Sequence, residues 1–130
     1  MNENFCLKWN DFKSNTSKIF GEFRDKDFLQ DVTLVGDDNA QIAAHKLVLS
    51  ACSEYFKNIF KSNKHSHPLL CLEGVKSKEI KNILDYIYNG EVNIHQEELD
   101  RFLELAQRFK LKAFLVDSLT YHRDLSLKAF

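Results

Sequence analysis

The sequence has little proline, glycine or cysteine and almost no net charge, and each shortage excludes a class of protein. One proline and four glycines among 130 residues leave no room for long linkers or low-complexity segments. Lys and Arg total 18 against 19 Asp and Glu, a net charge of −1, so the basic excess that drives sequence-independent nucleic-acid binding is missing. We therefore expect no direct contact between this chain and nucleic acid.

The spacing of the cysteines and the lack of long apolar runs indicate the cellular compartment in which the protein works. Cys6, Cys52 and Cys71 are odd in number and widely spaced, whereas small secreted domains carry dense, even sets. The polar N-terminus is not followed by the apolar run of roughly 7–15 residues that marks a signal peptide. No stretch approaches the ~20 apolar residues that span a bilayer. We expect a reducing cytosolic or nuclear compartment and no membrane contact.

Phenylalanine is the residue type in excess. The chain has 11 Phe, with one Trp and four Tyr, in a length that predicts a single domain with one core. Large aromatic side chains concentrate in cores and interfaces, and a core of this size cannot hold all of them. A self-associating interface is therefore expected from composition alone.

The N-terminal third predicts a strand and then a helix. Phe5, Leu7 and Trp9 alternate with polar residues, the period of a short strand over residues 5–9. The apolar residues after Asp11 follow the spacing i, i+4, i+7, i+8 and i+11, which predicts an amphipathic helix. Its stripe consists of Phe12, Thr16, Ile19, Phe20 and Phe23. The charged run 24–27 is expected to end this helix in solvent.

The rest of the chain alternates strand and helix signals. The expected elements are a hairpin of strands 28–35 and 40–45, a compact apolar segment 47–52, a helix over 55–60 capped by Ser53, a loop 61–67 and a strand 69–72. After these we expect a helix that is capped by Ser77 and ends at a left-handed cap at Asn89-Gly90, a strand 92–94 and a helix 99–113. Residues 117–130 are expected to form a loosely docked terminal helix. This order predicts an α+β fold, with helices packed on a small β-sheet.

Catalytic and metal-binding patterns are weak. No phosphate-binding glycine loop and no HExxH motif is present. His65, His67 and Cys71 lack the paired short spacings of a structural zinc site. Cys52 could pair with His45 as a nucleophile, but its apolar neighbours favour a buried, inert thiol. We expect no enzyme activity, no cofactor and no metal.

Two charges, Asp31 and Lys46, interrupt apolar runs. A lone buried charge costs several kcal/mol, roughly 3–5 when its partner is removed, so each is expected either to be paired or to lie on the solvated face of the hairpin. Periodicity alone leaves both possibilities open.

Three ordered stretches resemble one family. They are Asp31-Val32-Thr33-Leu34, the run from Ala44-His45-Lys46 through Ser50-Ala51-Cys52-Ser53 to Phe56, and Tyr86-Ile87-Tyr88-Asn89-Gly90-Glu91-Val92. In this order and spacing they resemble a BTB/POZ domain, and Phe5-Cys6-Leu7-Lys8-Trp9-Asn10 resembles the N-terminal signature of the Tramtrack-type subgroup of insect transcription factors. The chain departs from the pattern at Glu54, where proline is usual, and at Lys8, where arginine is commoner.

The resemblance implies a site and a function. It implies an intertwined homodimer, assembled into a larger multimer such as a hexamer, with an N-terminal strand exchanged between protomers. The implied sites are an oligomerisation strand (Phe5, Cys6, Leu7, Lys8, Trp9), a charged pocket at the dimer interface (Asp31, Lys46) and a dimer-interface helix (Phe12, Ile19, Phe20).

The implied function is homo-oligomerisation and protein recruitment within a nuclear regulator of transcription or chromatin architecture. Co-regulators and other BTB proteins are the expected further partners. The alternative is a substrate adaptor for a cullin-type ubiquitin ligase, which generally uses additional helices after the domain. We expect the domain to span residues 1–116, followed by a C-terminal extension over 117–130.

Overall fold

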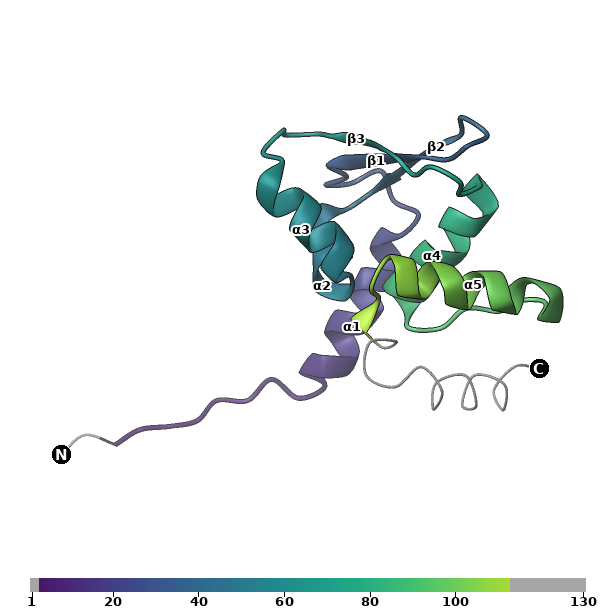
Figure 1. The fold of residues 1–130 in the computed structure, drawn as a ribbon. Coiled ribbons are helices and arrows are strands. Elements are labelled where there is room, and N and C mark those ends of the chain that lie inside the picture. Colours follow the sequence, from purple (N-terminus) through teal and green to yellow (C-terminus); the bar gives the residue numbers. More distant parts are fainter. Residues whose placement is uncertain (1–2, 113–130) are drawn as a thin grey trace.

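The computed structural model describes residues 3–112 and contains five helices and three strands in that range. A small sheet lies at one end of the molecule, and helices pack beneath it (Figure 1). In chain order the elements are α1 (Phe12–Phe23), β1 (Val32–Val35), β2 (Gln41–Ala44), α2 (Lys46–Cys52), α3 (Glu54–Ser62), β3 (Leu69–Cys71), α4 (Ser77–Asn89) and α5 (Gln96–Arg108). This is the α+β architecture that the sequence predicts.

The sheet has the strand order β2-β1-β3. β1 pairs antiparallel with β2 in the register Val32↔Ala44, and β3 returns parallel to β1. Val32 and Leu34 are buried while their neighbours are half-buried, so the sheet buries one face. The predicted turn at 36–39 is confirmed, and Asn39 takes the positive φ that such turns favour.

One core joins the sheet to the helices beneath it. Its largest fully buried side chains are Phe56, Phe109, Leu34, Leu49, Ile80, Leu84, Leu105 and Leu111. Rings stack within it, as Phe56 and Phe109 lie 5.4 Å apart between centroids. No residue of α1 is buried. The core of the described residues is thus built without the N-terminal helix.

Several local predictions are confirmed. α1 begins at Phe12, and α3 is capped by Ser53, whose Oγ accepts a hydrogen bond from Phe56 N at 3.1 Å. α4 ends at Gly90 with φ 78°, the left-handed conformation that glycine adopts without strain. Ser77, however, is the first residue of α4 rather than its cap, and Lys76 precedes the helix in an extended conformation.

α2 replaces the featureless apolar segment expected at 47–52. The helix begins at Lys46, directly after β2, and its Leu47 is 73% exposed. Asp31, 15 residues earlier, accepts a hydrogen bond from Lys46 N at 2.8 Å through Oδ1. A helix start that is stabilised by a distant carboxylate leaves no cap signal in the adjacent sequence, which explains why the pattern missed it.

Three strand predictions are wrong or too long. Residues 5–9 form no strand in the single chain, although β2 and β3 lie at the edges of the sheet, and residues 92–94 form none either. The strand expected over 28–35 begins only at Val32, because Leu29 takes a positive φ of 61° that breaks extended geometry. The last predicted helix, 99–113, is observed as Gln96–Arg108, while the terminal helix over 117–130 lies outside the described residues.

Arg24 does not lie in solvent with the rest of the charged run 24–27. Its side chain is only 14% exposed, and its Nε lies 3.3 Å from Oδ1 of Asp85 on α4. Its guanidinium also lies over the ring of Tyr88, 5.9 Å from the centroid. The C-terminal end of α1 is therefore attached to α4 by charge and by packing.

Candidate functional site

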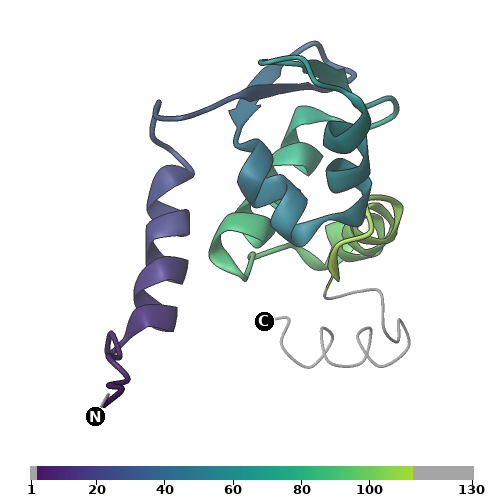
Figure 2. The ribbon, with the colours of Figure 1, turned by 90° about the vertical axis from the view of Figure 1, so that its left-hand side faces the viewer.

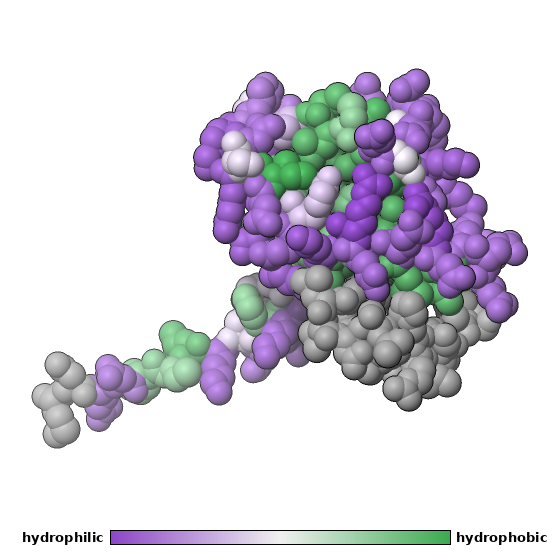
Figure 3. Space-filling model, viewed as in Figure 1, coloured by the Kyte–Doolittle hydropathy of each residue, from purple (hydrophilic) through white to green (hydrophobic). Residues whose placement is uncertain are grey.

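The N-terminal apolar surface is a set of large side chains that the core leaves uncovered. It consists of Phe5, Leu7, Trp9, Phe12, Ile19 and Phe20, all exposed. Residues 3–11 extend away from the domain, and apolar side chains lie along them (Figure 3). Leu7 is 92% and Trp9 59% exposed, which costs hydrophobic free energy in water. A surface of this kind is typical of an interface with another protein.

α1 stands beside the domain rather than within it (Figure 2). Only its C-terminal half approaches α4, where Gly21 lies against the end of that helix. A groove of about 990 Å³ follows this approach. It is lined by Ser17, Phe20 and Gly21 from α1 and by residues 85, 87–89 and 90–93. The expected interface helix therefore contributes Phe20 to a groove and leaves Phe12 and Ile19 on its open face.

His45 and Tyr88 fasten the segment between α1 and β1 to the core. The Tyr88 hydroxyl accepts a hydrogen bond from His45 N at 2.9 Å and lies 2.7 Å from Nδ1 of the same residue. Nε2 of His45 lies 2.7 Å from the carbonyl oxygen of Phe28. Because a carbonyl only accepts, Nε2 carries the proton and Nδ1 accepts from the Tyr88 hydroxyl. Burial raises the pKa of Tyr88 to about 12, so that hydroxyl keeps its proton.

Asp31 and Lys46 are brought together, but not as a side-chain ion pair. The Asp31 carboxylate accepts from the backbone of Lys46, while Lys46 Nζ donates to the carbonyl oxygens of His65 at 2.7 Å and Ser66 at 3.3 Å. Both side chains are half-buried. The structure thus places both beside polar partners within one chain, and their role at a dimer interface stays a prediction.

The residues considered above as weak candidates for metal binding or nucleophilic catalysis lie in structural settings. His67 Nε2 lies 2.8 Å from Oγ1 of Thr33, and His65 Nδ1 accepts from His67 N at 3.0 Å. Burial raises the pKa of the Cys52 thiol, which disfavours the nucleophilic thiolate. His45 is committed to Tyr88 and Phe28. Within residues 3–112, no group of three or more His, Cys, Asp or Glu side chains could hold a metal ion.

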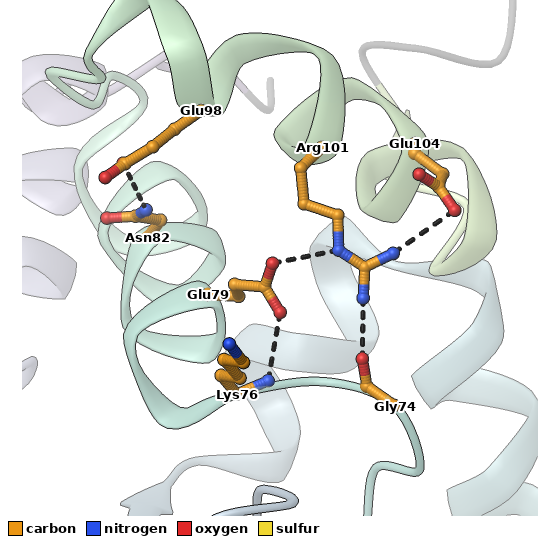
Figure 4. A network of polar contacts seen from close by, with 7 residues as sticks. All are labelled: Gly74, Lys76, Glu79, Asn82, Glu98, Arg101 and Glu104. Atoms are coloured by element: carbon orange, nitrogen blue, oxygen red, sulfur yellow. Dashed lines mark hydrogen bonds and ion pairs between the residues drawn. The ribbon is translucent and has the colours of Figure 1, made fainter.

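A polar network fixes α5 against α4 (Figure 4). Arg101 donates to Glu79 Oε2 at 2.8 Å, to the carbonyl oxygen of Gly74 at 2.6 Å and to Glu104 Oε1 at 3.2 Å. Burial opposes ionisation of Glu79, but hydrogen bonds from Arg101 and from Lys76 N hold its pKa below the ordinary value. Periodicity gave no signal for the contacts of Arg101 with Glu79 and Gly74, which lie 22 and 27 positions earlier in the sequence.

Comparison with known sequences identifies the fold. The sequence profile of the BTB/POZ domain matches residues 20–124. The chain belongs to the BTB/POZ domain family. BTB domains are protein-interaction modules, not enzymes, and they mediate self-association and contacts with other BTB proteins.

Relatives of this BTB domain occur in Drosophila melanogaster. It is 44% identical over 110 residues to Longitudinals lacking protein-like, covering 85% of this chain and 86% of that protein. It is 41% identical to protein abrupt and 39% identical to the alpha isoform of protein tramtrack, each over 85% of this chain. The chain spans only 12% and 13% of the lengths of those two proteins.

A solved structure shares the fold of this BTB domain. The BTB domain of human gigaxonin superimposes with a TM-score of 0.71 at 21% sequence identity, covering 87% of this chain and 92% of that one. None of the helices described here is both long and apolar enough to cross a bilayer. The N-terminal apolar surface and the α1–α4 groove are the candidate interaction sites of this BTB domain.

Proposed function

We propose that this chain is the self-association module of a nuclear regulator of transcription or chromatin architecture. The observation that carries the proposal is the N-terminal apolar surface, six large side chains that a single chain leaves in water. Interfaces of obligate homodimers are large and apolar, and a second copy would remove these side chains from solvent. The similarity to the abrupt and tramtrack proteins supports the regulatory context.

In this proposal α1 and the segment 5–9 have separate roles. Phe12, Ile19 and Phe20 on α1 form the dimer contact, and Asp31 with Lys46 lies in a charged pocket at its base. The segment Phe5-Cys6-Leu7-Lys8-Trp9 is the oligomerisation strand, which pairs with an edge of another protomer and assembles dimers into a larger multimer such as a hexamer. An extended peptide that adds to a sheet edge gains backbone hydrogen bonds and side-chain pockets together. Other BTB proteins and transcriptional co-regulators are the further partners.

Light scattering coupled to size-exclusion chromatography tests the proposal. We expect the mass of a dimer or a larger species over a dilution series at micromolar concentrations, since folded monomers of obligate dimers are often unstable. A species of 15.2 kDa that stays folded on dilution would refute it. Ile19→Ser with Phe20→Ser should lower the mass, whereas the matched pair Ser14→Ala with Asn15→Ala, also exposed on α1, should leave it unchanged.

A further inference from the structure

The chain is nearly neutral, but its charge is segregated along the sequence. Residues 55–72 contain three lysines and no acidic residue. Residues 91–104 contain five acidic residues and a single Arg or Lys, Arg101. The whole chain has a net charge of −1, but it contains one basic stretch and one acidic stretch.

Each stretch forms a face on a helix. The basic face consists of Lys57 and Lys61 on α3, four residues apart, and Lys64 in the loop that follows. The acidic face consists of Glu97, Asp100 and Glu104 on α5, at spacings i, i+3 and i+7. All but Lys57 are exposed. Like charges at this spacing repel each other along one side of a helix, which disfavours each face in isolation.

The single chain does not neutralise these faces. Of their six residues, only Glu104 takes part in an ion pair among the described residues, with Arg101. Helix dipoles favour Lys61 at the end of α3 and Glu97 at the start of α5, but they do not account for Lys64 or Asp100. Among the described residues Glu97 has only the nearby charge of Lys78, and Lys61, Lys64 and Asp100 are exposed charges that form no ion pair.

The two faces lie on opposite sides of the domain. α3 is at the left of Figure 1, and the N-terminal end of α5 is at the right. They therefore cannot meet within one chain. The network of Arg101 with Glu79 and Gly74 fixes α5 on α4, so the acidic face is held in place.

We propose that the basic face of one copy of this chain docks on the acidic face of another. Because the two surfaces differ, the contact is head-to-tail, and it propagates into a chain of copies or closes into a ring. It uses none of the residues of the N-terminal apolar surface, so it is a second, separate contact. Exposed ion pairs are individually weak and screened by salt, and the association is therefore reversible and salt-sensitive.

Charge exchange in the full chain tests this contact. The basic-face variant is Lys61→Glu with Lys64→Glu, and the acidic-face variant is Glu97→Lys with Asp100→Lys. The control, Lys26→Glu with Lys81→Glu, makes the same change in net charge as the basic-face variant, at exposed lysines outside both faces. The weight-average mass is measured by sedimentation velocity in about 0.05 M and about 0.5 M salt, between which the Debye length falls roughly threefold.

We expect the mass of the wild type and of the control to rise at the lower salt concentration. Each face variant alone should lose that rise, because it presents two faces of the same sign. An equimolar mixture of the two variants should regain it, since each then supplies the sign that the other lacks, and that recovery also shows that both variants are folded. A rise that persists in either variant alone, or a mixture that fails to recover, would overturn the proposal. Loss in the basic-face variant only would show that those lysines contact a different surface of the second copy, and it would overturn the proposal as well.

Discussion

The Cβ atom that Gly21 lacks would lie 2.6 Å from Oδ1 of Asn89. α1 thus approaches the end of α4 so closely that its backbone meets the side chain that precedes the C-cap Gly90. The same place forms part of the wall of the groove between the two helices. No turn and no positive φ requires a glycine at position 21, so this close approach is the physical reason for its presence.

Gly21→Ala should be tolerated and Gly21→Leu should not. Asn89 is exposed and can rotate its amide away from a methyl group, and alanine favours a helix over glycine by about 1 kcal/mol. A leucine side chain also reaches toward the carbonyl oxygen of Tyr88, 3.9 Å from the same Cβ position, and pushes α1 away. Hydrogen exchange of α1 amides measures this displacement. Wild-type protection in Gly21→Leu would contradict the packing described here.

Tyr88→Phe should destabilise the domain by about 1–3 kcal/mol, because it leaves buried polar groups of His45 without a partner. Urea unfolding measures the change. Tyr55→Phe is the matched control, since Tyr55 is partly buried in the same core and its hydroxyl has no hydrogen-bond partner among the described residues. Equal stability of the two variants would show that the Tyr88 hydroxyl contributes nothing to holding His45.

The sequence predicts the elements whose signals are local. Ser53 caps α3, Gly90 ends α4 and Asn39 turns the hairpin, and each of these residues acts on its immediate neighbours. A period of hydrophobic residues and a residue with a strong backbone preference therefore suffice to place those elements.

Features that depend on residues far apart in the sequence could not be predicted from local sequence patterns. The start of α2 depends on a hydrogen bond to Asp31, and His45 is hydrogen-bonded to Tyr88, which lies 43 positions later in the sequence. The segment 5–9 carries the period of a strand but pairs with no strand of the described chain, so its pairing with another protomer stays a prediction. The resemblance of this segment to the Tramtrack-type signature, rather than its periodicity, gives its predicted role.

Asp31→Ala should destabilise the domain by about 0.5–2 kcal/mol, the usual effect of removing an acceptor at a helix start. Asp31→Asn should have a smaller effect, because an amide oxygen can still accept from Lys46 N. Thermal unfolding of both variants makes the comparison. If Asn destabilises as much as Ala, the negative charge itself is required, which would favour charge pairing at the dimer interface over capping of α2.

Acid should weaken the link between the hairpin and α4. A hydrogen bond from Ser77 Oγ, 2.6 Å from Asp38 Oδ2, holds the pKa of Asp38 below its ordinary value. A carboxyl group whose pKa is lowered on folding stabilises the folded state above its ordinary pKa, near 3.9, and this stabilisation is lost as the pH falls through the folded pKa. We expect the free energy of unfolding to decrease below about pH 4, and to decrease less in Ser77→Ala. Equal slopes in wild type and Ser77→Ala would contradict the assignment.

A triple variant that combines Phe5→Ser, Leu7→Ser and Trp9→Ser should assemble only into dimers or smaller species. Its domain should stay folded. No residue before Val32 belongs to the described core, so the unfolding midpoint should stay close to that of the wild type. Cys6→Ser with Lys8→Ser changes the alternate side of the same segment and is the matched control, expected to keep the full mass. Light scattering gives the mass, and circular dichroism gives the midpoint.

Deletion of residues 1–9 should act like the triple variant. Outright unfolding of the deletion variant would place the segment in its own core, and full-size assemblies in the triple variant would show that these side chains do not connect dimers.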